Sequence, residues 1–234
     1  MPRFDIQQIL IRVLVLTFSL SIHEYAHART AYKLGDDTAA RQGRLTLSPL
    51  KHLDLYGAIA FVIAGFGWAK PVPVNPANFS HDKVKDMRFG MLRVAIAGPA
   101  SNLIIAFFAN LILQLLYFIL ILTGNLLAFQ SNPIFNIIFL ILSSFYFSNI
   151  FLALFNMLPI PPLDGSKVLG AFLPNRLYYQ YMAFQRYSGI VMLILIFFGG
   201  GILGRIIRFI SIPIDWLLST PVNLLFNLLI NAVN

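Results

Sequence analysis

The chain has 234 residues, of which 58% are hydrophobic and only 11% are charged, and its mean hydropathy is +0.77. A soluble domain carries about 25% charged residues, so this chain cannot cover a water-facing surface, and its 22 Phe exclude a disordered polar chain. The net charge of +8 does not indicate a nucleic-acid partner, because the basic residues concentrate in loops, as in membrane proteins. The absence of cysteine excludes disulfides, thiol catalysis and cysteine-bound zinc. The composition defines an integral membrane protein.

The first predicted crossing is the apolar run from about Ile6 to Ala28, which Arg12 interrupts. A helix needs about 20 apolar residues to span a bilayer, and this run is long enough. Its second half also resembles a secretory signal with a cleavage site, but cleavage there would discard the most distinctive residues of the chain. We therefore expect a retained transmembrane helix.

Residues 29–93 form a basic loop with ten of the 17 Lys and Arg residues against five Asp. The positive-inside rule places this loop in the cytoplasm and the N-terminus on the opposite side. Within the loop, Leu55 to Trp68 is apolar but too short to cross a bilayer. This length is typical of a re-entrant or interfacial segment.

Prolines and valines alternate after Trp68. Pro71 and Pro73 lack N–H groups along one edge, whereas Val72 and Val74 can still pair through the other edge. This pattern predicts an edge strand that holds an unwound substrate by β-augmentation. A rigid cytoplasmic loop is the alternative.

No Asp, Glu, Lys, Arg or His occurs from 94 to 163. This stretch predicts a second crossing within 90–123 and a third from about 133 to 157, joined outside by an uncharged linker at 124–132. The residues after Asp164 are basic again and therefore cytoplasmic. Two further apolar runs, at 188–203 and 216–233, make either one or two crossings, because glycines, prolines and charges break up the region between them.

Residues 23–27, His-Glu-Tyr-Ala-His, have the spacing H-E-x-x-H. On a helix, His23 and His27 lie one turn apart on one face, so both imidazoles can bind one metal ion. Glu24, the only Glu of the chain, then lies beside the metal, where it can take a proton from water. Ionisable residues at membrane depth are costly and usually functional, which favours a metal site over histidines that only cap a helix.

A catalytic zinc site uses three protein ligands, so a third is required. His52 and His81 lie in the basic loop, where we expect them to face water. Asp164 ends the uncharged stretch, and two predicted crossings separate it from His27, which places both on the same side of the membrane. Asp164 is the predicted third ligand.

Four motifs together resemble the site-2 protease family of intramembrane zinc metalloproteases. They are H-E-x-x-H at 23–27, G-W-A-K-P-V-P-V-N-P at 67–76, G-P-x-x-N at 98–102 and N-x-x-P-x-x-P-L-D-G at 156–165. The matches span residues 23–165, and no PDZ or CBS domain is recognised, as in the compact prokaryotic subgroup. The resemblance implies an all-α polytopic membrane protein with a three-helix catalytic core and one or two further helices. We expect a single membrane domain over 1–234, with the core at about 6–175 and the C-terminal helices at about 186–234.

The resemblance also implies the site. His23, His27 and Asp164 would bind one Zn²⁺, and Glu24 would be the general base. Asn156 would hydrogen-bond the substrate backbone. Further candidates for substrate binding are Asn102, Val72 and Val74, although Asn102 fits an interhelical hydrogen bond equally well.

The implied activity is hydrolysis of peptide bonds within, or at the cytoplasmic border of, transmembrane segments, as in regulated intramembrane proteolysis. The implied partners are single-pass membrane proteins and lipid, in the plasma (inner) membrane, with the active site opening toward the cytoplasm. The alternative function is a metal-ion transporter or channel that uses the same His and Asp residues. A transporter needs access from both sides and usually has repeats, and no repeat is visible in the sequence. The oligomeric state is open.

Overall fold

Four long helices dominate the computed structural model, which describes residues 6–64, 67–124, 132–191 and 200–233. They are α1 (Ile6–Leu34), α5 (Met87–Leu122), α7 (Pro133–Asn156) and α11 (Gly200–Val233). Each contains a stretch long and apolar enough to cross a membrane. The all-α polytopic membrane fold predicted from the sequence is confirmed.

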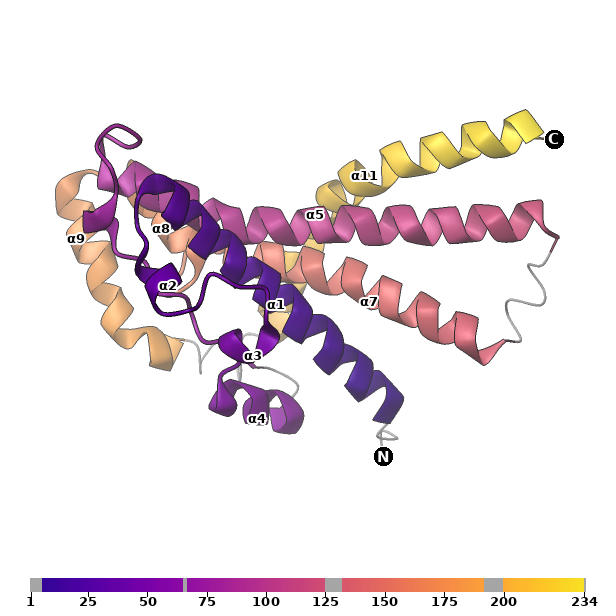
Figure 1. Ribbon diagram of the computed structural model, residues 1–234, viewed down its shortest axis with the longest axis horizontal. Coiled ribbons are helices and arrows are strands. Elements are labelled where there is room, and N and C mark those ends of the chain that lie inside the picture. Colours follow the sequence, from indigo (N-terminus) through magenta and orange to yellow (C-terminus); the bar gives the residue numbers. More distant parts are fainter. Residues whose placement is uncertain (1–5, 65–66, 125–131, 192–199, 234) are drawn as a thin grey trace.

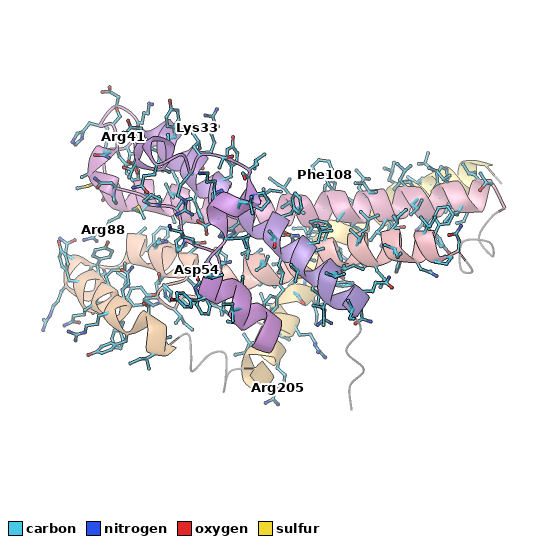
Figure 2. The ribbon with its side chains drawn as sticks, turned by 60° about the horizontal axis from the view of Figure 1, so that its bottom comes forward. Lys33, Arg41, Asp54, Arg88, Phe108 and Arg205 are labelled. Carbon is cyan, nitrogen blue, oxygen red and sulfur yellow. The ribbon has the colours of Figure 1, made fainter. Side chains whose placement is uncertain are left out.

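Short helices occupy the loops. They are α2 (Thr38–Arg41), α3 (Pro49–His52), α4 (Leu55–Ala64), η1 (Pro76–Asn78), α8 (Asp164–Phe172), α9 (Asn175–Ala183) and η2 (Phe184–Tyr187). In Figure 1, α2, α8 and α9 lie at the end of the molecule where α1 finishes and α5 begins. Figure 2 shows Lys33, Arg41 and Arg88 at this same end, whereas Phe108 lies farther along α5. These three basic side chains are therefore separated from the apolar middle of the bundle.

Helix α5 is the centre of the bundle, because it contacts α1, α7, α8 and α11. Figure 1 shows α5 and α7 running side by side with α1 crossing them at an angle. Small residues make the close approach possible: Ala106 and Ala109 of α5 are buried against Tyr146 and Ile150 of α7. Close packing at small residues is how membrane helices associate, since lipid provides no hydrophobic drive between them.

The starts of α5 and α7 follow local sequence signals. Asp86 accepts a hydrogen bond from the N–H of Arg88 (2.8 Å), and Asn132 accepts one from Ile134 (2.9 Å). Both are N-caps, which satisfy N–H groups that have no partner within the helix. These caps set where the second and third predicted crossings begin.

The C-terminal region differs from the expected broken segment. Helix α11 runs without interruption from Gly200 to Val233 through Pro213 and Pro221. Prolines are tolerated in membrane helices when neighbouring groups satisfy the freed carbonyls. Asp215 of α11 accepts a hydrogen bond from the Tyr146 hydroxyl of α7, which ties this helix to the core. Residues 125–131, in the predicted linker, and 192–199, in the predicted run at 188–203, lie outside the described residues.

The proline segment, residues 71–74, is not part of a β-sheet. Within the described residues the only β-bridge joins Leu53 and Ala69 in antiparallel orientation, and no strand is formed. Side chains take the backbone groups that a neighbouring strand would use: Arg44 donates to the carbonyls of Lys70 and Pro71, and Glu24 accepts from the N–H of Val72. The N–H of Val72, one of the two residues predicted to pair, therefore faces the protein itself.

Candidate active site

Three predicted ligands meet inside the bundle. The Nε2 atoms of His23 and His27 lie 3.0 Å apart, and Oδ2 of Asp164 lies 3.2 Å from the first and 3.1 Å from the second. All three side chains are buried. The two histidines are on α1 and the aspartate begins α8, so the site joins residues 137 positions apart in the sequence. Among the described residues these three side chains could hold a metal ion, and they are called the metal group below.

The chemistry of these donors fits zinc. Nδ1 of His27 lies 2.7 Å from the Val94 carbonyl, and Nδ1 of His23 lies 2.6 Å from Oδ1 of Asn102. Both oxygens only accept, so each Nδ1 carries the proton and each neutral imidazole turns an Nε2 lone pair inward. Two nitrogen lone pairs and a carboxylate oxygen therefore point toward one place with no proton between them. A cation bound there would offset the repulsion between these three atoms. Tetrahedral ligands about 2.0–2.1 Å from zinc lie about 3.3 Å apart, close to the spacing here.

A buried polar chain fixes the orientation of His23. Asn102 of α5 accepts from His23 and donates through Nδ2 to Oδ1 of Asn149 on α7 (2.7 Å). Asn149 in turn donates to the Ser19 hydroxyl (2.8 Å) and to the Phe145 carbonyl (2.8 Å). Each amide can satisfy its partners in only one orientation, so the chain presents an acceptor to His23. Hydrogen bonds of this kind orient metal-binding histidines.

Asn149 and Ser19 are functional candidates that the sequence reading missed. Both are fully buried, on α7 and α1. An Asn in the middle of an apolar span is a signal that could have found Asn149, because buried amides in membranes need partners. The hydroxyl of Ser19 has no comparable signal, since serines are common in membrane helices.

Gly98 lies directly against the two histidines. A Cβ at this position would lie 2.4 Å from Nε2 of His27 and 2.6 Å from Cε1 of His23. No side chain fits there, so α5 approaches the ligands with its bare backbone. The glycine of the G-P-x-x-N motif thus lies at the site itself.

Asp164 is placed by a tight turn. A Cβ on the next residue, Gly165, would lie 2.1 Å from the carbonyl oxygen of Met157, so the start of α8 packs directly on the end of α7. The second carboxylate oxygen of Asp164, Oδ1, lies 3.3 Å from Nζ of Lys167. This ion pair leaves Oδ2 for the metal group.

Glu24 is buried, and its Oε2 accepts a hydrogen bond of 2.7 Å from the Val72 N–H. The structure therefore brings Val72 to the site. Val74, the other predicted strand residue, instead packs against a hydrophobic cluster that includes Leu34 and Phe79. Asn156 donates to the Leu152 carbonyl of its own helix (3.0 Å), and no contact between Asn156 and the metal group is among the hydrogen bonds of the described residues.

The histidines of the basic loop differ from each other. His81 is exposed, as expected, but His52 is only 1% exposed and contacts Arg44. The expectation that His52 faces water is wrong, because its ring nitrogens are held by Arg44 and by the Thr46 carbonyl. His52 lies outside the group of metal donors.

A cavity of about 650 Å³ lies between α1 and α7, below the segments 49–58 and 67–69. Its walls are mainly apolar, with hydroxyl groups from Ser143, Ser144 and Ser148 on α7. Its lining includes Ser21 and Leu152, which lie close in sequence to His23 and Asn156. None of His23, Glu24, His27 and Asp164 is among the residues that line the cavity.

Comparison with known proteins identifies the class. The sequence profile described as Peptidase family M50 matches residues 11–201, and the chain therefore belongs to this family of metalloproteases, the site-2 protease family. It is a zinc metalloprotease with several membrane-spanning helices.

Three similar proteins are each named as a putative zinc metalloprotease. The chain is 42% identical over 187 residues to "Putative zinc metalloprotease YwhC" of Bacillus subtilis, covering 78% of each chain. It is 31% identical over 171 residues to "Putative zinc metalloprotease MJ0611" of Methanocaldococcus jannaschii, covering 72% of this chain and 73% of the other. It is also 31% identical over 157 residues to "Putative zinc metalloprotease Rip2" of Mycolicibacterium smegmatis, covering 64% and 52%. No solved structure matches the chain.

Proposed function

We propose that this metalloprotease cleaves peptide bonds within, or at the cytoplasmic border of, transmembrane segments of other proteins. The observation that carries the proposal is the depth of the metal group. His23 lies five residues before Ala28, where the predicted crossing ends, which is about 8 Å along a helix long and apolar enough to cross a membrane. A protease site at this depth reaches bonds inside the bilayer.

Each residue of the site has a role in this proposal. His23, His27 and Asp164 hold zinc, which when bound lowers the pKa of a water molecule and polarises the scissile carbonyl. Glu24 takes a proton from the attacking water and passes it to the leaving amine. Because Oε2 of Glu24 is held by the Val72 N–H, its other oxygen is left for this proton.

Two asparagines have different proposed roles. The Asn102 side chain is taken up by His23 and Asn149, so it orients a ligand rather than binding substrate. Among the hydrogen bonds of the described residues, the Asn156 amide binds only the Leu152 carbonyl of its own helix, so it can turn toward the substrate backbone beside the metal. A donor that stabilises the developing oxyanion typically contributes about 3–4 kcal/mol to catalysis.

The substrate approaches from the lipid in this proposal. A transmembrane helix must unwind before its bonds can be attacked, because its carbonyls are already hydrogen-bonded. The apolar cavity between α1 and α7, with its serine hydroxyls, suits such a segment. We assign single-pass proteins as substrates, and the plasma membrane as location with the basic end in the cytoplasm. The transporter alternative is not favoured, because the family is a protease family.

The test is Glu24→Gln in purified protein. Cleavage of a single-pass transmembrane reporter should fall by about 10²–10⁴-fold, the usual contribution of a general base. Zinc per chain, measured by elemental analysis, should stay at the wild-type value. Asp164→Ala is the control that should lose zinc. Reporter cleavage at the wild-type rate by Glu24→Gln would contradict the role of Glu24.

A further inference from the structure

A buried cation lies beside the proline segment without an acidic partner. Arg44, between α2 and α3, is only 6% exposed and belongs to none of the ion pairs found in the described residues. Its Nη1 donates to the Pro71 carbonyl (2.8 Å), and its Nη2 donates to the Lys70 carbonyl (2.6 Å). Burying a charge is costly, so a fork on two consecutive carbonyls points to a specific task for Arg44.

His52 also holds this part of the chain, through its contact with Arg44 and through its main-chain carbonyl. Its Nε2 lies 2.8 Å from the Thr46 carbonyl, which only accepts, so Nε2 carries the proton and Nδ1 is an acceptor that faces Arg44 at 3.5 Å. The main-chain carbonyl of His52 accepts from the Lys70 N–H (2.8 Å). The backbone carbonyl of Lys70 is therefore held by Arg44, and its backbone N–H is held by His52.

These contacts end one residue before Val72. Pro71 and Pro73 restrict the backbone on both sides of Val72, so the direction of its N–H follows from where residues 70 and 71 are held. That N–H donates to Oε2 of Glu24 at 2.7 Å. Because the Pro71 carbonyl and the Val72 N–H belong to one planar peptide unit, the position of Arg44 is transmitted through that unit to the carboxylate of the proposed base.

We propose that Arg44, braced by His52, is a positioning residue that holds the proline segment so that the Val72 N–H orients Glu24. The inference rests on the proposed function, because it assumes that Glu24 is the base. Arg44 has no hydrogen bond to His23, His27 or Asp164 among the described residues, so it acts without touching the metal group. Lys cannot replace it, because a single ammonium group lacks the planar fork that reaches two carbonyls.

The first experiment needs no substrate. Hydrogen exchange of the full chain in detergent, read by mass spectrometry, compares wild type with Arg44→Met and with the milder Arg44→Lys. We expect exchange in peptides that contain Val72 to rise at least 10-fold in Arg44→Met and less in Arg44→Lys, with zinc per chain and exchange in α1 and α5 unchanged. Arg41→Met is the matched control, since Arg41 is exposed and pairs only with Asp37. Unchanged exchange at Val72 in both Arg44 variants would overturn the inference.

The second experiment separates positioning from loop stability. It uses a single-pass transmembrane reporter that the wild-type chain cleaves, and Glu24→Gln is assayed beside the other variants. Per zinc-loaded chain, kcat/KM should fall by about 10²-fold in Arg44→Met, as for a misplaced catalytic group. Val72→Pro, which removes the N–H, should lose a similar amount, and the double variant should lose no more than the worse single variant.

Two outcomes of the second experiment contradict the inference. One is wild-type kcat/KM in Arg44→Met per zinc-loaded chain, which would give Arg44 a purely structural role. The other is additive loss in the double variant, which would mean that Arg44 acts by another route. Activity in Glu24→Gln would instead overturn the proposed function, so the two failures are distinguishable.

Discussion

Asn149 shows how a residue remote from the chemistry can shape a metal site. It is fully buried on α7 and reaches His23 only through Asn102. If it is lost, the Nδ2 group of Asn102 has no acceptor, and this amide is free to rotate and present a donor to the proton on His23. The Nδ1 side of the imidazole then has no fixed acceptor, and the ring is held by its contacts with Gly98, His27 and Asp164.

We expect Asn149→Leu to weaken zinc binding by about 10-fold, the lower end of the effect of groups that hold metal ligands. The dissociation constant is measured by competition with a chelator. Asn110→Leu is the matched control, because Asn110 is a buried Asn of α5 whose Nδ2 has no partner. Equal zinc affinity in wild type and Asn149→Leu would exclude the chain of hydrogen bonds as a determinant of the site.

Hydrogen bonds connect the loop that follows α1 to the residues that follow the proline segment. Gly35 adopts φ +112°, which favours glycine, and the Asp36 N–H closes the helix on the Ala31 carbonyl (3.0 Å). The Asp36 carboxylate then accepts from the N–H of Asn75 (2.7 Å) and the amide of Asn78 (2.9 Å). Asp36 thus fixes where the chain lies after the proline segment, as Arg44 does before it.

This network makes part of the stability depend on pH. Burial raises the pKa of Asp36, but hydrogen bonds from Thr38, Asn75 and Asn78 outweigh burial and hold the pKa below its ordinary value. A carboxylate with a lowered pKa stabilises the fold above its unfolded pKa of about 3.9, and this stabilisation is lost as the pH falls through the lower folded value.

Asp36→Asn should therefore lower the free energy of unfolding by about 2 kcal/mol at pH 7, because hydrogen bonds to a charged group are lost. The difference from wild type should shrink below about pH 4. Denaturant unfolding in detergent at several pH values measures this. Asp37→Asn is the control, since Asp37 forms only an exposed pair with Arg41, and such pairs contribute about 0–1 kcal/mol. A pH-independent difference would contradict the assignment to the Asp36 carboxylate.

At the scale of the whole molecule, the helices alternate in direction. The end of α1 and the start of α5 lie at one end, the end of α5 and the start of α7 lie at the other, and α7 runs back toward the first end (Figure 1). Because Lys33, Arg41 and Arg88 of the basic loop lie at the first end (Figure 2), the positive-inside rule predicts that this end is cytoplasmic. The metal group on α1 lies nearer to it than to the opposite end.

The lack of cysteine makes this orientation directly testable. Lys85→Cys places a thiol at an exposed position of the basic loop, and Thr123→Cys places one at the exposed end of α5. In intact cells, a membrane-impermeant maleimide should label Thr123→Cys, and it should label Lys85→Cys only after permeabilisation. The reverse pattern would place the site on the outer side of the membrane.

Local patterns in the sequence were enough for the membrane class, the first three crossings and the convergence of His23, His27 and Asp164. Apolar length follows from bilayer thickness, and the two histidines share a face because of the helical repeat. Asp164 could be placed on the same side of the membrane as the histidines because two predicted crossings, an even number, separate it from α1.

Tertiary structure alone decided the rest. The placement of the proline segment and the partners of Asn149 and Arg44 depend on hydrogen bonds between residues far apart in sequence. An Arg in a basic loop and an Asn in an apolar helix have no local signature that names their partners. Their partners are set by how α1, α5 and α7 pack, because a buried polar group must find its hydrogen bond wherever the fold brings one within reach.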